Sequence, residues 1–245
     1  MTKNLSRREF LASIGVTAGA LGLAQLADLG KSVQARTNVL ARGREKDLYP
    51  ILEDGKYIKK DFSHLTRNKK LVFSPEIIQN HIGLYNGYVD NVNKAEGMMA
   101  KGEVDDYSLK HLAFSLNGMA LHDIYFSNMT TDTTKRSGSL TKAIEETFGS
   151  VDAYMKNLTT IATKVEGWSI TGLNLLNGKI FNYGEDTHSG NFPNFVVPIL
   201  ALDVYEHAYV ADFAKEGKTR YIDVFTKTID WDLVSRRFDA AKNLV

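Results

Sequence analysis

Imidazole and carboxylate groups occur in three segments of the chain whose other residues are mostly apolar. His81 and His122 each lie in a stretch with helical periodicity, while Asp203 ends an apolar run and precedes His207 by four residues. Taken singly, each histidine fits a hydrogen-bonded core residue, and an Asp-x-x-x-His pair is common by chance. The chemistry open to such groups is metal ligation or proton transfer.

The composition narrows the kind of site that these groups could form. The 245 residues contain no Cys, which excludes disulfide scaffolds, zinc–thiolate sites, iron–sulfur clusters and a cysteine nucleophile. Any metal must therefore be held by His, Asp or Glu. The 30 basic and 29 acidic residues give a formal net charge of +1, which offers no bulk attraction for nucleic acid.

Two long helical patterns would position the first two histidines. A Ser-Pro pair at 74–75 is typical of a helix start, and apolar residues recur at helical spacing over 77–99. A second helix is predicted over 108–129. Because only a short charged link separates the two, we expect an antiparallel hairpin that ends in the polar stretch 130–138.

The second half of the chain mixes helical and strand patterns. We expect strands over 168–175, 179–183 and 196–202, and an Asn-Gly pair at 177–178 predicts a hairpin turn between the first two. The apolar run 196–202 is interpreted as a central strand, although Pro198 disfavours that position. Helices are expected over these ranges: 140–148, 151–165, 205–214 and 231–241.

This order of elements predicts an α+β protein. An N-terminal antiparallel helical hairpin over 75–134 is followed by an α/β domain over 135–245, with a small three-stranded antiparallel sheet and surrounding helices. Residues 36–74 are rich in charge and are expected to form an irregular extension along the surface.

The first 35 residues are typical of a targeting segment. Ser-Arg-Arg-Glu-Phe-Leu at 6–11 precedes a weakly apolar run and a small-residue cleavage pattern, as in a twin-arginine signal; an N-terminal membrane anchor is the alternative. We therefore expect residues 1–35 to direct the protein to the twin-arginine export machinery, across the cytoplasmic membrane and into the periplasm. Their removal leaves 26 basic and 27 acidic residues.

The segment 203–209, Asp-Val-Tyr-Glu-His-Ala-Tyr, closely resembles the metal-binding signature Asp-Val-Trp-Glu-His-Ala-Tyr of the iron/manganese superoxide dismutases. The resemblance extends in order and spacing over roughly residues 66–243. The segment 81–91 is similar to the first helix of that family, 117–122 to the second, and 229–231 to the start of the last helix.

The resemblance implies one Mn or Fe ion per chain, held by His81, His122, Asp203 and His207. It also implies that Tyr88 is an active-site phenol that relays protons. Four more residues would line the centre or a dimer interface: Trp168, Tyr205, Glu206 and Tyr209. At that interface Glu206 of one chain would accept a hydrogen bond from the ligand imidazole of its partner and so fix the orientation of that ring.

Several positions depart from the family pattern. Tyr205 and Phe126 replace tryptophans, and Leu84 or Tyr85 stands where the family has a gateway His. The changed groups surround the ligands, so they bear on rate more than on metal binding.

The spacing around the first ligand leaves two alternatives. The interval from His81 to Tyr88 is one residue shorter than usual, so the helix would lack a local bulge, or Asn80 would take the ligand position instead. Gly118 occupies a site where iron-type enzymes often have Gln. His188 is therefore a candidate to contact the metal-bound solvent and relay protons, the alternative being a plain surface-loop residue.

The function implied by the resemblance is disproportionation of superoxide to oxygen and hydrogen peroxide by a homodimer or tetramer. A metal-binding relative with weak or lost dismutase activity is the second hypothesis, because the aromatic residues around the site are changed. A periplasmic helical binding module without metal is the third.

Overall fold

The computed structural model describes residues 48–132, 134–190 and 192–245. The predicted signal over 1–35 and the first part of the extension lie outside the described residues. Among the residues that the structure describes, no helix is long and apolar enough to cross a membrane.

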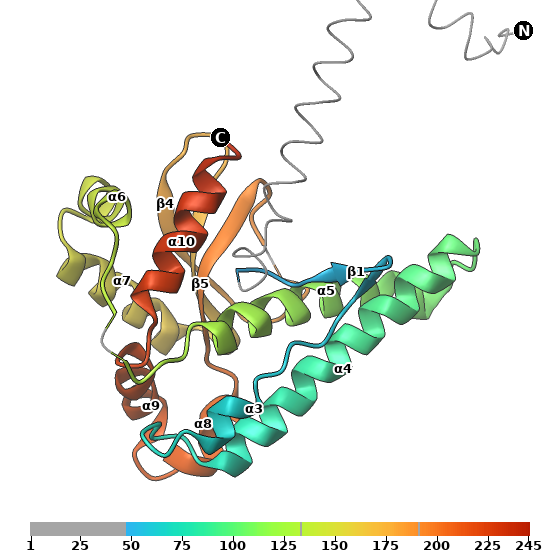
Figure 1. Cartoon of the computed structure of the whole chain (residues 1–245), viewed down its shortest axis with the longest axis horizontal. Coiled ribbons are helices and arrows are strands. Elements are labelled where there is room, and N and C mark those ends of the chain that lie inside the picture. The colour runs from blue at the N-terminus through green and yellow to red at the C-terminus, as the bar shows by residue number, and fades with distance from the viewer. Residues whose placement is uncertain (1–47, 133, 191) are drawn as a thin grey trace, which may run out of the picture. The chain divides into compact units, whose positions relative to one another are not determined.

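A pair of long helices forms the first half of the fold, as the sequence predicts. Helix α4 (Pro75–Ala100) and helix α5 (Asp106–Ser127) pack against each other as an antiparallel hairpin (Figure 1). Ser74 caps α4 by accepting a hydrogen bond from the Ile77 amide, next to Pro75 at the first helical position. Asp105 caps α5 in a capping box.

The extension before the hairpin contributes to the core, although its high charge predicted a segment that lies only along the surface. Its described part contains β1 (Leu52–Glu53), β2 (Lys56–Tyr57) and α3 (Ser63–Arg67). Leu48 and Phe62 are buried, because scattered apolar side chains of the extension fill gaps beside the hairpin while its charged groups stay outside. Figure 1 shows this blue segment running beside α4.

The second half supplies the sheet that the sequence predicts, flanked by helices. Helix α6 (Gly138–Phe148) ends at Gly149, which has the left-handed conformation (φ 82°), and Ser150 caps the next helix, α7 (Val151–Lys164). The strands that follow are β3 (Trp168–Asn174), β4 (Ile180–Glu185) and β5 (Val196–Asp203).

The order of strands in this antiparallel sheet is β4-β3-β5, so the prediction that 196–202 is the central strand is wrong. In the described part of the chain β5 lies at an edge, and β3 is central. The reason is visible at Pro198, which has no N–H to donate to a second neighbour. Pro198 lies opposite Gly172, where the register between β3 and β5 shifts.

The predicted hairpin between β3 and β4 is confirmed, with a looser turn than the Asn-Gly pair suggested. Gly178 has a positive φ of 68°, but Asn177 does not enter the left-handed region. The Gly178 amide donates to the Asn174 carbonyl and the Asn174 amide to the Lys179 carbonyl, so the turn spans five residues.

Three helices complete the fold: α8 (Glu206–Phe213), α9 (Gly217–Thr226) and α10 (Trp231–Lys242). Helix α9 was not predicted. It begins after a polar stretch at Glu216, whose side chain makes no capping hydrogen bond, so the sequence carries no local start signal.

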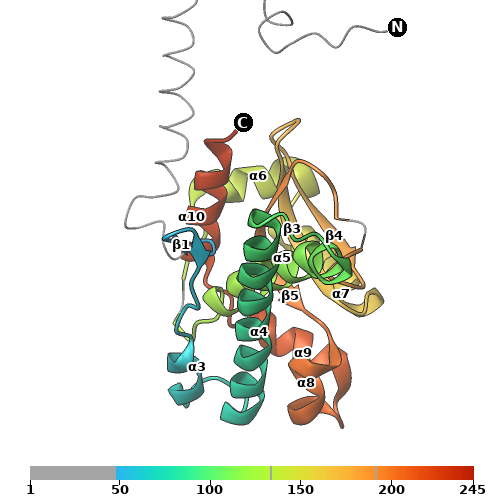
Figure 2. The same cartoon turned by 90° about the vertical axis from the view of Figure 1, so that its right-hand side faces the viewer.

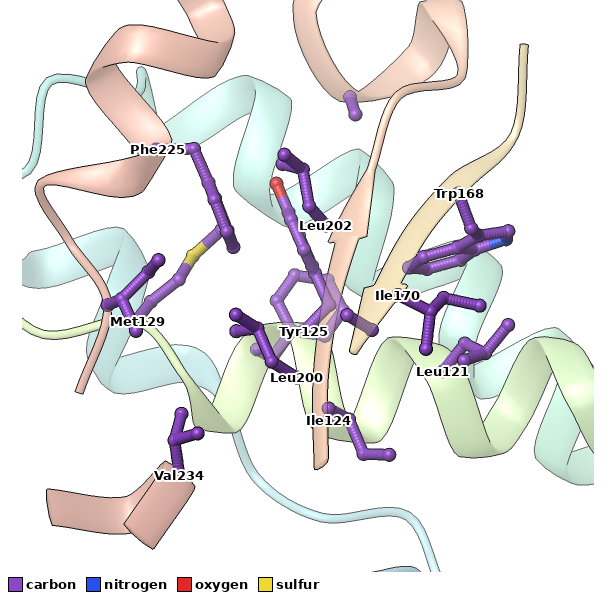
Figure 3. Close-up of a cluster of buried hydrophobic side chains, with 14 of the residues drawn as sticks. Leu121, Ile124, Tyr125, Met129, Trp168, Ile170, Leu200, Leu202, Phe225 and Val234 are labelled. Atoms are coloured by element: carbon purple, nitrogen blue, oxygen red, sulfur yellow. The ribbon is translucent and has the colours of Figure 1, made fainter. Parts of the chain in front are cut away.

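The main core lies between α5 and the sheet. Figure 3 shows Leu121, Ile124 and Tyr125 of α5 facing Ile170 of β3 and Leu200 of β5, all of which are buried. In the view of Figure 2, α4 and α5 lie in front of the strands and α10 beside them. Asp203, at the end of β5, is thereby held next to the hairpin.

A buried cation ties the extension to this core. The guanidinium of Arg237 in α10 donates to the Leu48 carbonyl at 2.7 Å, to Asn128 Oδ1 at 2.8 Å and to the Ile199 carbonyl at 2.9 Å. Because its side chain is fully buried, these hydrogen bonds replace the water that a charge would otherwise require.

Candidate metal centre

Four side chains from four elements converge at one point. His81 comes from α4, His122 from α5, Asp203 from the end of β5 and His207 from the first turn of α8. One ligand atom from each lies within 4.8 Å of the others, and all but His207 are buried. The structure therefore brings together the four residues that the sequence singled out as metal ligands.

The alternative ligand Asn80 does not belong to this group. Its side chain is exposed, whereas His81 is buried with Nε2 at 3.1 Å from Asp203 Oδ2. Helix α4 continues as a regular α-helix through this region. The local bulge is therefore absent, as the shorter interval from His81 to Tyr88 predicted. Tyr88, two turns after His81, consequently lies on the same face.

Asp203 is the centre of the cluster. Its Oδ2 lies 3.1 Å from His81 Nε2, 3.3 Å from His207 Nε2 and 3.5 Å from His122 Nε2. Its Oδ1 accepts from the Tyr205 amide at 2.9 Å. Burial would raise the pKa of Asp203, but hydrogen bonds from His207 and His81 outweigh burial and hold it well below its usual range. The residue is therefore an anion.

His122 has the orientation that a metal ligand requires. Its Nδ1 lies 2.6 Å from the Gly118 carbonyl, which places the ring proton on that nitrogen. Its Nε2 is buried and has no hydrogen-bond partner among the described residues. A buried lone pair without a partner is costly in a core histidine, and a cation at this position would satisfy it.

Burial keeps the imidazoles of His81 and His122 neutral. Burial lowers the pKa of His81 and lowers that of His122 well below the usual value. Neutral imidazoles and an ionised carboxylate are the protonation states that bind a metal. The donor set of three nitrogens and one oxygen suits Mn or Fe, so the residues fit the ion that the sequence resemblance implied.

Aromatic side chains and one further imidazole enclose the cluster. The Tyr88 ring lies 5.1 Å from that of His122 and 4.9 Å from that of His188, and Trp168 lies 5.0 Å from His122. His188 follows β4 in a turn held by Asn117, whose Nδ2 donates to the His188 carbonyl at 2.7 Å. The structure thus places His188 beside the cluster and not on the surface.

Two of these groups have strongly shifted acidities. Burial lowers the pKa of His188 to about 4, so its ring is neutral near pH 7. Burial, with the Asp203 charge, raises the pKa of Tyr88 to about 12, so the phenol keeps its proton. Both His188 nitrogens are buried without a hydrogen-bond partner in the described part of the chain.

The residues that replace family tryptophans also contact the cluster. Tyr205 stacks on His207 with ring centroids 5.3 Å apart, and Phe126 lies 5.0 Å from His81. Glu206 is exposed, and together with Tyr209 it lines an open groove that reaches His207. Contact of Glu206 with a partner chain stays a prediction.

Sequence reasoning missed a second polar cluster behind the ligands. Asp123 is fully buried directly after His122 and is bound by Lys60 and Tyr85. The signal was an acidic residue in an otherwise apolar helix, but its cationic partner lies 63 residues away and leaves no local pattern.

The helical hairpin, the small sheet and the cluster of three imidazoles and one carboxylate define a candidate mononuclear metalloprotein of the α+β class. Comparison with known proteins agrees. Residues 136–237 match the family model described as iron/manganese superoxide dismutases, C-terminal domain.

Relatives with similar sequences carry the same family name. The chain is 32% identical over 192 residues to superoxide dismutase [Fe] of Aquifex pyrophilus, covering 73% of this chain and 90% of the relative. It is 31% identical over 168 residues to superoxide dismutase [Mn] of Mycolicibacterium smegmatis, covering 66% of this chain and 81% of that one. The chain belongs to the iron/manganese superoxide dismutase family.

Proposed function

We propose that this protein is a superoxide dismutase with one Mn or Fe ion per chain, held by His81, His122, Asp203 and His207. The observation that carries the proposal is the buried Nε2 of His122, which has no hydrogen-bond partner among the residues that the structure describes and lies beside two further imidazoles and an ionised carboxylate. The names of the similar proteins support the reaction and include both metals.

When bound, the metal supplies one-electron chemistry, so that two superoxide ions and two protons give oxygen and hydrogen peroxide. The chain's own residues hold the ion, exclude bulk water and manage the protons. Trp168 and Phe126 form apolar walls at the buried ligands. Asp203 brings the single negative charge of the ligand set.

Tyr88 and His188 are the groups we propose for proton transfer. The Tyr88 phenol, with a pKa of about 12, holds a proton at neutral pH, and the neutral His188 ring can accept one at one nitrogen while donating at the other. Their ring centroids are 4.9 Å apart, and no hydrogen bond joins the two side chains in the described part of the chain, so a proton passing between them requires a bridging water.

A second function is favoured by the exchanged aromatic residues. Tyr205 and Phe126 touch the ligands in place of tryptophans, which motivates a metal-binding relative with weak or lost dismutase activity. The ligand set is the same in both proposals, and only turnover distinguishes them.

Export and assembly belong to the same proposal. The Arg-Arg-containing sequence at 6–11 supports export by the twin-arginine machinery to the periplasm. The exposed Glu206 and the neighbouring Tyr209 support a homodimer or a tetramer in which these residues face the partner.

Metal analysis combined with a superoxide assay tests the proposed function, with His122→Ala as the comparison. We expect about one Mn or Fe per wild-type chain and turnover above that of free metal, and a loss of both in the variant. Stoichiometric metal without turnover would establish the second function. Less than a tenth of a metal per chain after expression with metal would overturn both.

A further inference from the structure

The segment between β2 and the end of α3, residues 58–67, lies against α4 and α5, two of the three helices that carry histidine ligands. We call this segment the strap. Its Lys60 amide donates to the Tyr85 hydroxyl of α4 at 3.2 Å. Its Phe62 ring lies 5.4 Å from the Tyr85 ring and 5.1 Å from that of Phe126 in α5. The strap therefore spans the two helices at the level of the metal cluster.

A buried ion pair joins the strap to α5. Lys60 Nζ lies 2.8 Å from Asp123 Oδ1, with 10% of the lysine side chain and none of the aspartate exposed. The Tyr85 hydroxyl donates to Asp123 Oδ2 at 3.3 Å. Burial raises the pKa of Asp123 and Lys60 opposes that shift, while Arg237 is a second, more distant cation acting on the same carboxylate.

The contacts that Lys60 and Phe62 of the strap make with α4 and α5 lie within about one helical turn of a ligand. Asp123 directly follows His122, and Phe126 lies one turn beyond it on the same helix. Tyr85 lies one turn beyond His81. Through Lys60 and Phe62 the strap thus contacts Tyr85, Asp123 and Phe126, which lie close to the ligands in the two helices, whereas Lys59 contacts α4 farther away at Asp90.

An ion pair of this kind is poorly explained by stability alone. Taking two charges out of water cancels most of their attraction, so buried pairs contribute little net stability and are better attested as devices that fix register. Metal ligands, in contrast, must be held to within about 0.5 Å of their working geometry by the residues around them. Fixing α4 against α5 at the ligand level meets that need.

We propose that Lys60 is a positioning residue of the metal centre: through Asp123 and Tyr85 it sets the relative placement of His81 and His122, and thereby how tightly the ion is held. This inference rests on the proposed metal site. It gives the described part of the charged extension a role in metal retention.

The test compares Lys60→Met with Lys59→Met in the full chain loaded with manganese. Lys59 is the matched control, because it is the neighbouring lysine and its ion pair with Asp90 is at the surface. We expect Lys60→Met to release Mn²⁺ to a chelator about tenfold faster than wild type, and Lys59→Met to release it at the wild-type rate. Lys60→Arg should recover most of the retention.

Unfolding temperatures measured with and without manganese separate positioning from packing. A positioning role predicts that the increase in unfolding temperature on metal loading is smaller in Lys60→Met than in wild type. Equal losses in the loaded and metal-free forms, with an unchanged release rate, would overturn the proposal.

A double variant covers the case in which Lys60→Met does not fold. Lys60→Met combined with Asp123→Leu removes both charges instead of stranding one in the core, and the same criteria apply to it. Failure of the wild type to bind Mn or Fe would overturn the proposed function and this inference together. Wild-type binding with unchanged release from the variants would overturn the positioning role alone.

Discussion

Replacing Gly118 by alanine should disturb the centre from inside α5. Gly118 lies one turn before His122, and a Cβ added there would lie 3.0 Å from His188 Nδ1 and 3.0 Å from two ring atoms of Tyr88. Those distances are shorter than ordinary van der Waals contact, and both neighbours are rigid rings. We therefore expect the two proposed proton-transfer groups to be pushed apart.

The size of the effect follows from two opposing terms. Alanine in place of glycine inside a helix stabilises by about 1 kcal/mol, whereas overpacking a filled core costs typically about 1–3 kcal/mol. Gly83 in α4 provides the matched control, because a Cβ there meets no atom of the described residues within 4 Å. The stabilities of Gly118→Ala and Gly83→Ala should therefore differ by about 1–3 kcal/mol.

Urea unfolding of the two metal-free variants measures this difference, and turnover of the metal-loaded proteins measures its consequence. We expect Gly118→Ala to lose at least about tenfold in turnover, since displacements near 1 Å can cost about a hundredfold. Gly83→Ala should retain wild-type turnover. Adding His188→Ala to Gly118→Ala should restore part of the stability. If Gly118→Ala were stabilised as much as Gly83→Ala, the proposed packing of His188 and Tyr88 around Gly118 would be refuted.

Further predictions concern acid, the buried cation and the start of β3. Burial lowers the pKa of His188 to about 4 in the native state, whereas in the unfolded chain the residue takes up its proton below about pH 6.5. The unfolded state therefore binds more protons between about pH 6.5 and pH 4, and the free energy of unfolding falls as the pH falls through this range. His188→Gln should reduce that slope in metal-free protein by up to about 1.4 kcal/mol per pH unit, measured by urea unfolding at each pH; an unchanged slope would contradict it. Arg237→Met should lower the unfolding temperature by roughly 6–12 °C, because it leaves two buried carbonyl groups without donors. The control Arg236→Met, at an exposed position, should change the unfolding temperature little. Equal effects of the two variants would contradict a stabilising role for the buried Arg237 hydrogen bonds. Gly167→Ala should destabilise the metal-free protein by more than about 2 kcal/mol, because its Cβ would lie 2.6 Å from the Glu185 carbonyl oxygen; wild-type stability in urea would show that the backbone can yield there.

Local signals in the sequence were enough for much of the fold. Ser74 caps α4 at the predicted helix start, and Ser150 caps α7 directly before the predicted range 151–165, because capping involves only neighbouring residues. The helical hairpin and the small antiparallel sheet follow from periodicity. The position of β5 within the sheet is harder to predict. The apolar run around Pro198 has the same pattern at the centre of a sheet as at an edge covered by helices, and only the missing N–H of Pro198 distinguishes the two.

The residues of the candidate site likewise include some that local sequence predicts and some that depend on distant contacts. Asp203 and His207 lie within one short motif, and His81 and His122 were found by their resemblance in order and spacing to the family. The pairing of Lys60 with Asp123 could not be predicted, because it depends on how the strap crosses the hairpin. Long-range pairs of this kind have no period or spacing in the chain.

The four ligand candidates are synthesised at different times, and this order determines when the metal site is complete. His81 and His122 leave the ribosome early, but His207 follows His81 by 126 positions, and Asp203 is placed only when β5 pairs with β3. A nascent chain therefore presents two imidazoles without their carboxylate. The complete set of donors exists only after the last strand has closed the sheet. The compartment in which folding finishes is thus the one whose metal pool first meets the complete site.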